Sequence, residues 1–143
     1  NVQLAEAVKY QLEQLGLTIN IGAYEDKIFN DYRAKREFDI VAASWASEYP
    51  DISSYFYGML STNINNYASF ADEQFDNLYR KALSLSGSSE RFPYYHELEN
   101  IAMDSFAIIP LYGVNTEFIA KENVSGFYHD VTGCLHLEGS SIK

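Results

Sequence analysis

The stretch that decides the fold is FDIVAASWASEYPD, residues 38–51. Its first half, residues 38–44, is a nearly continuous apolar run, which is typical of a central strand covered on both faces. Its second half brings two aromatic rings and two carboxylates into the seven residues from Trp45 to Asp51. Ligands of open α/β sheets bind beyond the carboxyl ends of the strands. This half therefore either lines a binding cleft or is an ordinary strand end, and its position favours the cleft.

The segments before this stretch predict a strand–helix–strand unit. The apolar positions of residues 2–15 recur at helical spacing, and Gly16 follows where a left-handed helix cap is expected. Residues 17–21 alternate like a half-buried strand, and residues 25–36 return to helical spacing. Together with the strand at residues 38–44, this order predicts two parallel strands joined by a right-handed crossover.

The second half of the chain predicts two further helices and several short strands. The helices span residues 72–85 and a segment from residue 88 or 89 to about residue 105. Residues 107–113 contain a proline and predict an edge strand, and the glycine-punctuated tail from residue 124 predicts short strands and turns. The fold class expected is α/β, with a mixed sheet flanked by helices in one lobe over residues 1–143.

Composition excludes several classes of function. The formal net charge of −10 would repel phosphate backbones, so no nucleic-acid partner is expected. With Cys134 as its single cysteine, the chain has no internal disulfide, and no apolar run is long enough for a membrane span. The chain opens directly in an amphipathic helix without a visible signal peptide, so we expect it to be a segment of a longer protein.

Four stretches together resemble one known family. They are FDIVAASWASEYPD, NNYASFADEQFDNLYRKAL, SSERFPYYHELENIAMDSFAIIPLYG and ENVSGFY. Each occurs in the order of the family-five extracellular solute-binding proteins, the oligopeptide- and dipeptide-binding components of ABC importers. The resemblance covers nearly all of this chain and the C-terminal part of a typical member. It implies the C-terminal lobe of a two-lobed, type II periplasmic-binding-protein-like fold.

The resemblance also implies a function and partners. The lobe would capture peptides for an ABC importer without catalysis and without a cofactor or metal. Its partners would be a peptide, the remaining lobe of the full-length protein and an ABC permease in the membrane. Its location would be extracytoplasmic, in the periplasm or at the cell surface as a lipoprotein.

In peptide-binding members an acidic residue shortly after the tryptophan pairs with the α-amino group of the peptide. Counting from Trp45, that position is Glu48, one methylene longer than the aspartate of the family. Some members carry an arginine in the strand before the tryptophan, where this chain has Ala42 and Ala43. Asp51 either contacts the ligand or caps the helix that follows it. The predicted ligand-binding residues are Trp45, Ser47, Glu48, Tyr49, Asp51 and Tyr112.

Other functions stay open at this point. Within the family, the ligand could instead be a nickel chelate, an oligosaccharide or a signalling peptide. A different class is a small thiol hydrolase or metalloprotein that uses Cys134 and His136, with His129 and Asp130 nearby. That alternative lacks any Cys-x-x-Cys, His-Glu-x-x-His or nucleophile-elbow pattern.

Overall fold

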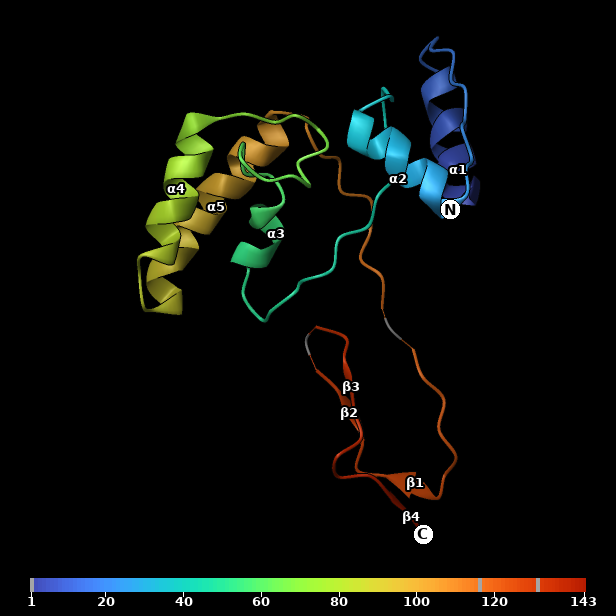
Figure 1. Ribbon diagram of the computed structural model, residues 1–143, viewed down its shortest axis with the longest axis vertical. Helices are drawn as coiled ribbons and strands as arrows, with labels where there is room; N and C mark the ends of the chain where they lie inside the picture. Colours follow the sequence, from blue (N-terminus) through green and yellow to red (C-terminus); the bar gives the residue numbers. More distant parts are fainter. Residues whose placement is uncertain (1, 116, 131) are drawn as a thin grey trace. The chain divides into compact units, whose positions relative to one another are not determined.

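The computed structural model describes residues 2–115, 117–130 and 132–143. Its backbone divides into two compact units, Asn1–Ser44 and Trp45–Lys143. The elements of the described residues are α1 (Val2–Glu13), α2 (Asp26–Lys35), α3 (Ser53–Tyr57), α4 (Glu73–Leu83), α5 (Ser88–Asp104), β1 (Val124–Ser125), β2 (Tyr128–His129), β3 (Leu135–His136) and β4 (Ser141–Ile142) (Figure 1). The boundary between the units falls directly before the first predicted site residue, so all predicted site residues belong to the second unit.

The helices α1, α2, α4 and α5 confirm the four long helices predicted from apolar periodicity, with ends shifted by at most two residues. Gly16 follows α1 with a φ of +82°, the left-handed conformation that glycine adopts without steric cost. Asp72 precedes α4, and its carboxylate accepts a hydrogen bond from the backbone N–H of Phe75 at 2.8 Å. The residues next to these two helix ends therefore carry the caps expected from local sequence.

The strands predicted over residues 17–21, 38–44 and 107–113 are not strands in the structure, and the parallel strand–helix–strand unit does not form (Figure 1). These segments run as loops, and Ile40 is 67% exposed. A strand exists only when a neighbouring strand supplies its hydrogen-bond partners, whereas a helix satisfies its own backbone. The three strand predictions are therefore wrong for the structure, because no described segment supplies hydrogen-bond partners to these apolar runs.

The core of the second unit lies between α4 and α5, which pack side by side (Figure 1). Phe75 and Leu98 are completely buried at this contact, and Ala82 and Ala102 allow the two helices to approach closely. Each large buried side chain contributes about 1.5–3 kcal/mol of burial free energy. The short helix α3 packs against α4, which places the segment before α3 next to this core.

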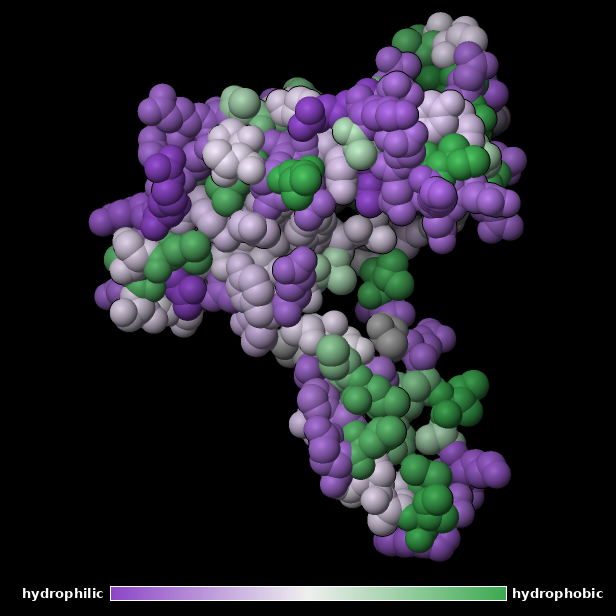
Figure 2. Space-filling model, in the orientation of Figure 1, coloured by the Kyte–Doolittle hydropathy of each residue, from purple (hydrophilic) through white to green (hydrophobic). Residues whose placement is uncertain are grey.

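The C-terminal segment forms two antiparallel strand pairs, β1 with β4 and β2 with β3. This confirms the short strands and turns predicted for the tail, apart from Val131, which lies outside the described residues. Gly126 has a φ of +84°, and a Cβ atom there would lie 2.1 Å from the carbonyl oxygen of Gly139, so the turn requires glycine. Figure 2 shows green, apolar surface in its lower part, where this segment lies. Leu135, Leu137 and Ile142 of the segment are exposed.

Candidate ligand-binding site

Trp45 lies against α3 with part of its ring accessible. Its indole Nε1 donates a hydrogen bond to the carbonyl oxygen of Ser54 at 3.2 Å, and its side chain is 40% exposed. The ring rests on Gly58, where an added Cβ would come within 2.5 Å of it. Trp45 is therefore fixed by one hydrogen bond and one close contact, while part of its surface remains available to a ligand.

The backbone of Glu48 is anchored and its side chain is exposed. The Glu48 N–H donates to the hydroxyl oxygen of Ser54 at 2.9 Å. The Ser47 hydroxyl donates to the carbonyl oxygen of Tyr49, which holds the backbone on the other side of Glu48. This arrangement presents a carboxylate to the surroundings from a backbone that is held in place.

Asp51 is bound on both carboxylate oxygens. Oδ2 pairs with Nη1 of Arg91 at 2.7 Å, and Oδ1 accepts hydrogen bonds from the Tyr95 hydroxyl at 2.8 Å and the Ser53 N–H at 2.9 Å. Burial alone would raise the pKa of Asp51, but the hydrogen bonds from Ser53 and Tyr95 and the charge of Arg91 outweigh it and lower the pKa. The bond to the Ser53 N–H ties Asp51 to the start of α3, but the N-cap residue of that helix is Ile52 and not Asp51.

A second polar contact joins Tyr49 to the core. The Tyr49 hydroxyl lies 3.1 Å from the hydroxyl of Ser53, which is almost completely buried. Burial of Tyr79 on α4, reinforced by its hydrogen bond with Tyr49, raises the pKa of the Tyr79 phenol. Tyr79 therefore stays neutral at physiological pH and can donate a hydrogen bond within this cluster.

Tyr112 lies elsewhere in the chain, between α5 and β1, with a side chain that is 61% exposed. Sequence reasoning did not single out four residues that hold the predicted site segment: Ser53, Ser54, Arg91 and Tyr95. The spacing of Arg91 and Tyr95 places the two side chains on one helix face, but nothing in the sequence links that face to Asp51. The two serines carried no signal beyond their place after a predicted cap.

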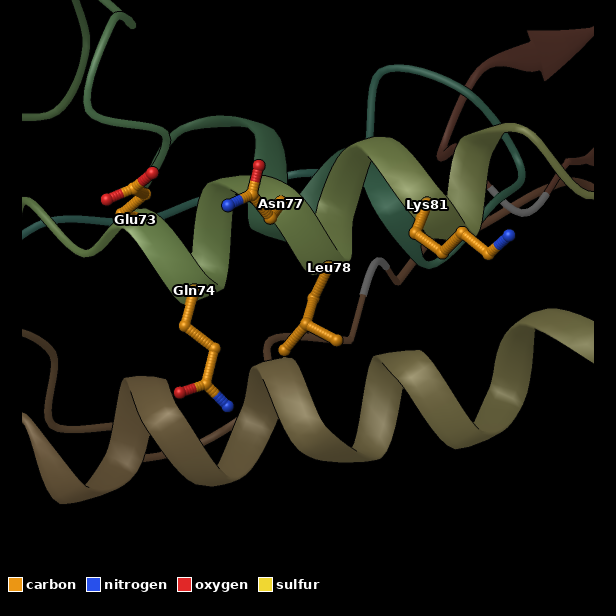
Figure 3. Close-up of a pocket in the computed structure, with 5 residues that line it drawn as sticks. All are labelled: Glu73, Gln74, Asn77, Leu78 and Lys81. Atoms are coloured by element: carbon orange, nitrogen blue, oxygen red, sulfur yellow. The ribbon is translucent and has the colours of Figure 1, made fainter.

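A surface hollow of the second unit lies on α4, away from this segment. The hollow has a volume of about 520 Å³ and is lined by Glu73, Gln74, Asn77, Leu78 and Lys81 (Figure 3). In Figure 3 the side chains of Gln74 and Leu78 point toward the neighbouring helix α5. None of the predicted ligand-binding residues lines it.

The Cys134 and His136 cluster has a different geometry from a thiol catalytic site. His136 Nε2 lies 2.9 Å from Oδ2 of Asp130, and Nδ1 lies 3.1 Å from Oε1 of Glu138. The hydrogen bonds with Asp130 and then Glu138 raise the pKa of His136. Both ring nitrogens are thus engaged with carboxylates, and neither is placed to activate the thiol. Within the described parts of the chain, no three or more His, Cys, Asp or Glu side chains form a group that could hold a metal ion.

Of the helices in residues 2–115, 117–130 and 132–143, none has the length and apolar character needed to cross a bilayer.

Comparison with solved structures defines the class of fold. MppA, described as a periplasmic murein tripeptide binding protein in its unliganded open form, superposes with a TM-score of 0.69 at 26% identity and covers 72% of this chain. The pheromone receptor PrgZ superposes with a TM-score of 0.81 at 17% identity over 99% of this chain. The chain covers 20% and 27% of these two structures. Its fold is therefore that of a segment of an α/β peptide-binding protein.

Sequence comparison points to one family. Residues 1–67 match the model of the bacterial extracellular solute-binding proteins, family 5 Middle. The periplasmic oligopeptide-binding protein OppA of Salmonella typhimurium is 30% identical over 131 residues, which are 92% of this chain. The dipeptide-binding protein DppE of Bacillus subtilis is 24% identical over 95% of this chain. These matches support similarity to a fragment of the family 5 bacterial extracellular solute-binding proteins, and the chain spans about a quarter of the length of these relatives, 23% and 25%.

Proposed function

We propose that the chain forms part of one lobe of an extracytoplasmic solute-binding protein that captures peptides for an ABC importer without catalysing a reaction. The names of the curated relatives OppA and DppE, which state oligopeptide and dipeptide binding, support peptides as the ligand class. The observation that carries the proposal is the exposed carboxylate of Glu48 on an anchored backbone, beside the partly exposed ring of Trp45. Ser47, Tyr49, Asp51 and Tyr112 complete the proposed set.

Glu48 would bind the positively charged α-amino group of the peptide. A charge-assisted hydrogen bond to an ammonium group contributes about 1.5–3 kcal/mol net, which corresponds to roughly a tenfold to hundredfold change in affinity. Trp45 would supply an apolar wall that excludes water from this contact. The peptide backbone would be held by strand-like hydrogen bonds, which suit peptides of varied sequence.

The proposed partners are the remaining lobe and a membrane permease. Residues 17–21 and 38–44 carry exposed apolar side chains. In a complete protein of the length of OppA, these segments would form strands by pairing with parts of the chain beyond the 143 residues. In the complete protein the two lobes would close around the peptide, and the closed form would dock on the permease. The periplasm, or the cell surface through a lipid anchor, is the proposed location.

The test is calorimetric titration of the full-length protein with alanine peptides, from the dipeptide to the pentapeptide. Glu48→Gln removes the charge and keeps the shape, and we expect affinity to fall about tenfold or more. Glu6→Gln, which removes an exposed carboxylate from α1, is the charge-matched control and should leave affinity unchanged. Unchanged affinity in Glu48→Gln would exclude Glu48 from the site, and the absence of binding to any of these peptides by the unmodified protein would refute peptide capture.

A further inference from the structure

We infer that Arg91 and Tyr95 of α5 are positioning residues for peptide binding, because they clamp Asp51 and thereby fix the orientation of the segment that carries Glu48. The inference rests on the proposed function, and it adds two residues that do not touch the peptide. It also gives Asp51 a positioning role within the proposed set. The contacts that carry it lie within the second unit.

The clamp consists of two partly buried contacts, from Arg91 and from Tyr95, to the carboxylate of Asp51. Arg91 Nη1 lies 2.7 Å from Asp51 Oδ2, and the two side chains are only 19% and 24% exposed. The hydroxyl of Tyr95, a buried residue, donates to the other carboxylate oxygen at 2.8 Å. A carboxylate held at both oxygens by groups of one rigid helix has little freedom to rotate, so α5 sets the position of Asp51.

Short hydrogen bonds to the backbone around Asp51 then fix the position of Glu48. The Asp51 N–H donates to the carbonyl oxygen of Tyr49 at 2.7 Å, and that same carbonyl accepts from the hydroxyl of Ser47. The Glu48 N–H is held by Ser54 at 2.9 Å, on the helix that begins just after Asp51. Displacement of Asp51 would therefore shift both attachments that flank the exposed carboxylate.

The geometry of α5 lets Arg91 and Tyr95 hold Asp51 together. They are four residues apart and lie on one face of α5, where Arg91 Nη1 is 3.4 Å from the Tyr95 hydroxyl. Arg91 Nε is buried and has no hydrogen-bond partner among the described residues. Partly buried ion pairs add little net stability, since desolvation offsets their attraction. The Arg91–Asp51 pair leaves the Nε donor of Arg91 unsatisfied, so a role in orienting Asp51 explains the pair better than a gain in stability.

The experiment measures selectivity for a free α-amino group. The full-length protein is titrated with alanine peptides, from the dipeptide to the pentapeptide, each with a free and with an acetylated α-amino group. The ratio of the two affinities reports how well the carboxylate of Glu48 is placed. A merely structural defect would weaken both forms of the peptide equally and leave the ratio unchanged.

The variants remove the clamp in steps. Arg91→Met should lower the free-amine preference about tenfold. Tyr95→Phe keeps the buried ring and should lower the preference by a few-fold, and Arg91→Lys should restore part of what Arg91→Met loses, because a lysine keeps the charge but not the fork. The matched controls are Arg80→Met on the exposed face of α4 and Tyr94→Phe, the adjacent tyrosine of α5. Both controls should leave the preference unchanged.

The outcomes separate this inference from the proposed function. If Glu48→Gln removes the free-amine preference while Arg91→Met and Tyr95→Phe keep it, the clamp is refuted and peptide capture stands. If Glu48→Gln leaves the preference intact, or no peptide binds, the proposed site fails and the clamp fails with it. If Arg91→Met does not fold, Tyr95→Phe decides. Faster amide exchange over residues 45–52 in both clamp variants, and not in the controls, is the expected structural signature.

Discussion

Asn66 offers a sharp test of how the loop between α3 and α4 is held. The side chain is buried at 5% exposure. Its Nδ2 donates toward the carbonyl oxygens of Met59 and Leu60, both at 3.2 Å, and of Phe70, while its Oδ1 accepts from the Phe70 N–H at 3.1 Å. One amide thus ties the end of α3 to the chain that leads into α4. The perturbation is Asn66→Ala, which deletes the amide and leaves the backbone groups without it.

The magnitude follows from the number of hydrogens. The amide nitrogen carries two, so its three acceptors share two donated hydrogen bonds, and the accepted bond makes a third. At about 1 kcal/mol net for each, Asn66→Ala should lower the free energy of unfolding by about 3 kcal/mol. The Phe70 N–H lies in a half-buried residue and would lose this partner, so the loss should exceed that for an exposed amide. The neighbouring Asn65 is exposed, so Asn65→Ala should lower the free energy of unfolding by less than about 0.5 kcal/mol.

The assay is urea unfolding of the 143-residue chain, followed by circular dichroism and by the fluorescence of Trp45, its only tryptophan. Asn66→Asp is a second informative variant, because it keeps the acceptor but brings a negative charge toward three carbonyl oxygens, and it should destabilise at least as much as alanine. Equal midpoints for Asn66→Ala and Asn65→Ala would show that this amide does not hold the loop.

Two further predictions concern the site and the C-terminal segment. Gly58→Ala would place a Cβ atom 2.5 Å from the ring of Trp45, so the ring must move. We expect a red-shifted tryptophan emission and a loss of about 1–3 kcal/mol in the free energy of unfolding. Gly113→Ala is the control, because its Cβ would meet nothing within 4 Å, and it should leave the tryptophan emission unchanged. The raised pKa of His136 means that its two carboxylate contacts stabilise the β2–β3 pair below about pH 6.5 and weaken as pH rises through the folded-state pKa. Amide exchange of this pair, corrected for intrinsic rates, should therefore be faster at about pH 8 than at about pH 5.5, and His136→Asn should abolish that difference; a difference that persists in the variant would assign the titration to another group.

The helices were predictable because each satisfies its own hydrogen bonds. Apolar spacing, with Gly16 as the expected cap of the first helix, was enough to locate α1, α2, α4 and α5 within two residues. The resemblance to family 5 proteins likewise follows from sequence motifs, since the order of four stretches between residues 38 and 128 agrees with the matches found.

The site was predictable only in part. The segment Trp45–Asp51 could be singled out from its residue types and its position after an apolar run. Its supports on α5 could not, because Arg91 lies forty residues further along the chain and looks like an ordinary surface arginine in a helical pattern. Whether Asp51 faces a ligand or a helix was open in the sequence, and the structure shows it paired with Arg91 and Tyr95.

Sequence alone therefore indicated the helices, the resemblance to family 5 proteins and the residues that carry charge and aromatic surface near Trp45, because those features depend on neighbours within a few positions. Tertiary structure alone decided which segments pair, which apolar runs stay exposed and which helix holds Asp51. The physical reason is range: helical hydrogen bonds and caps close within four residues, whereas strand pairing and ion pairs such as Asp51–Arg91 depend on segments that only folding brings together.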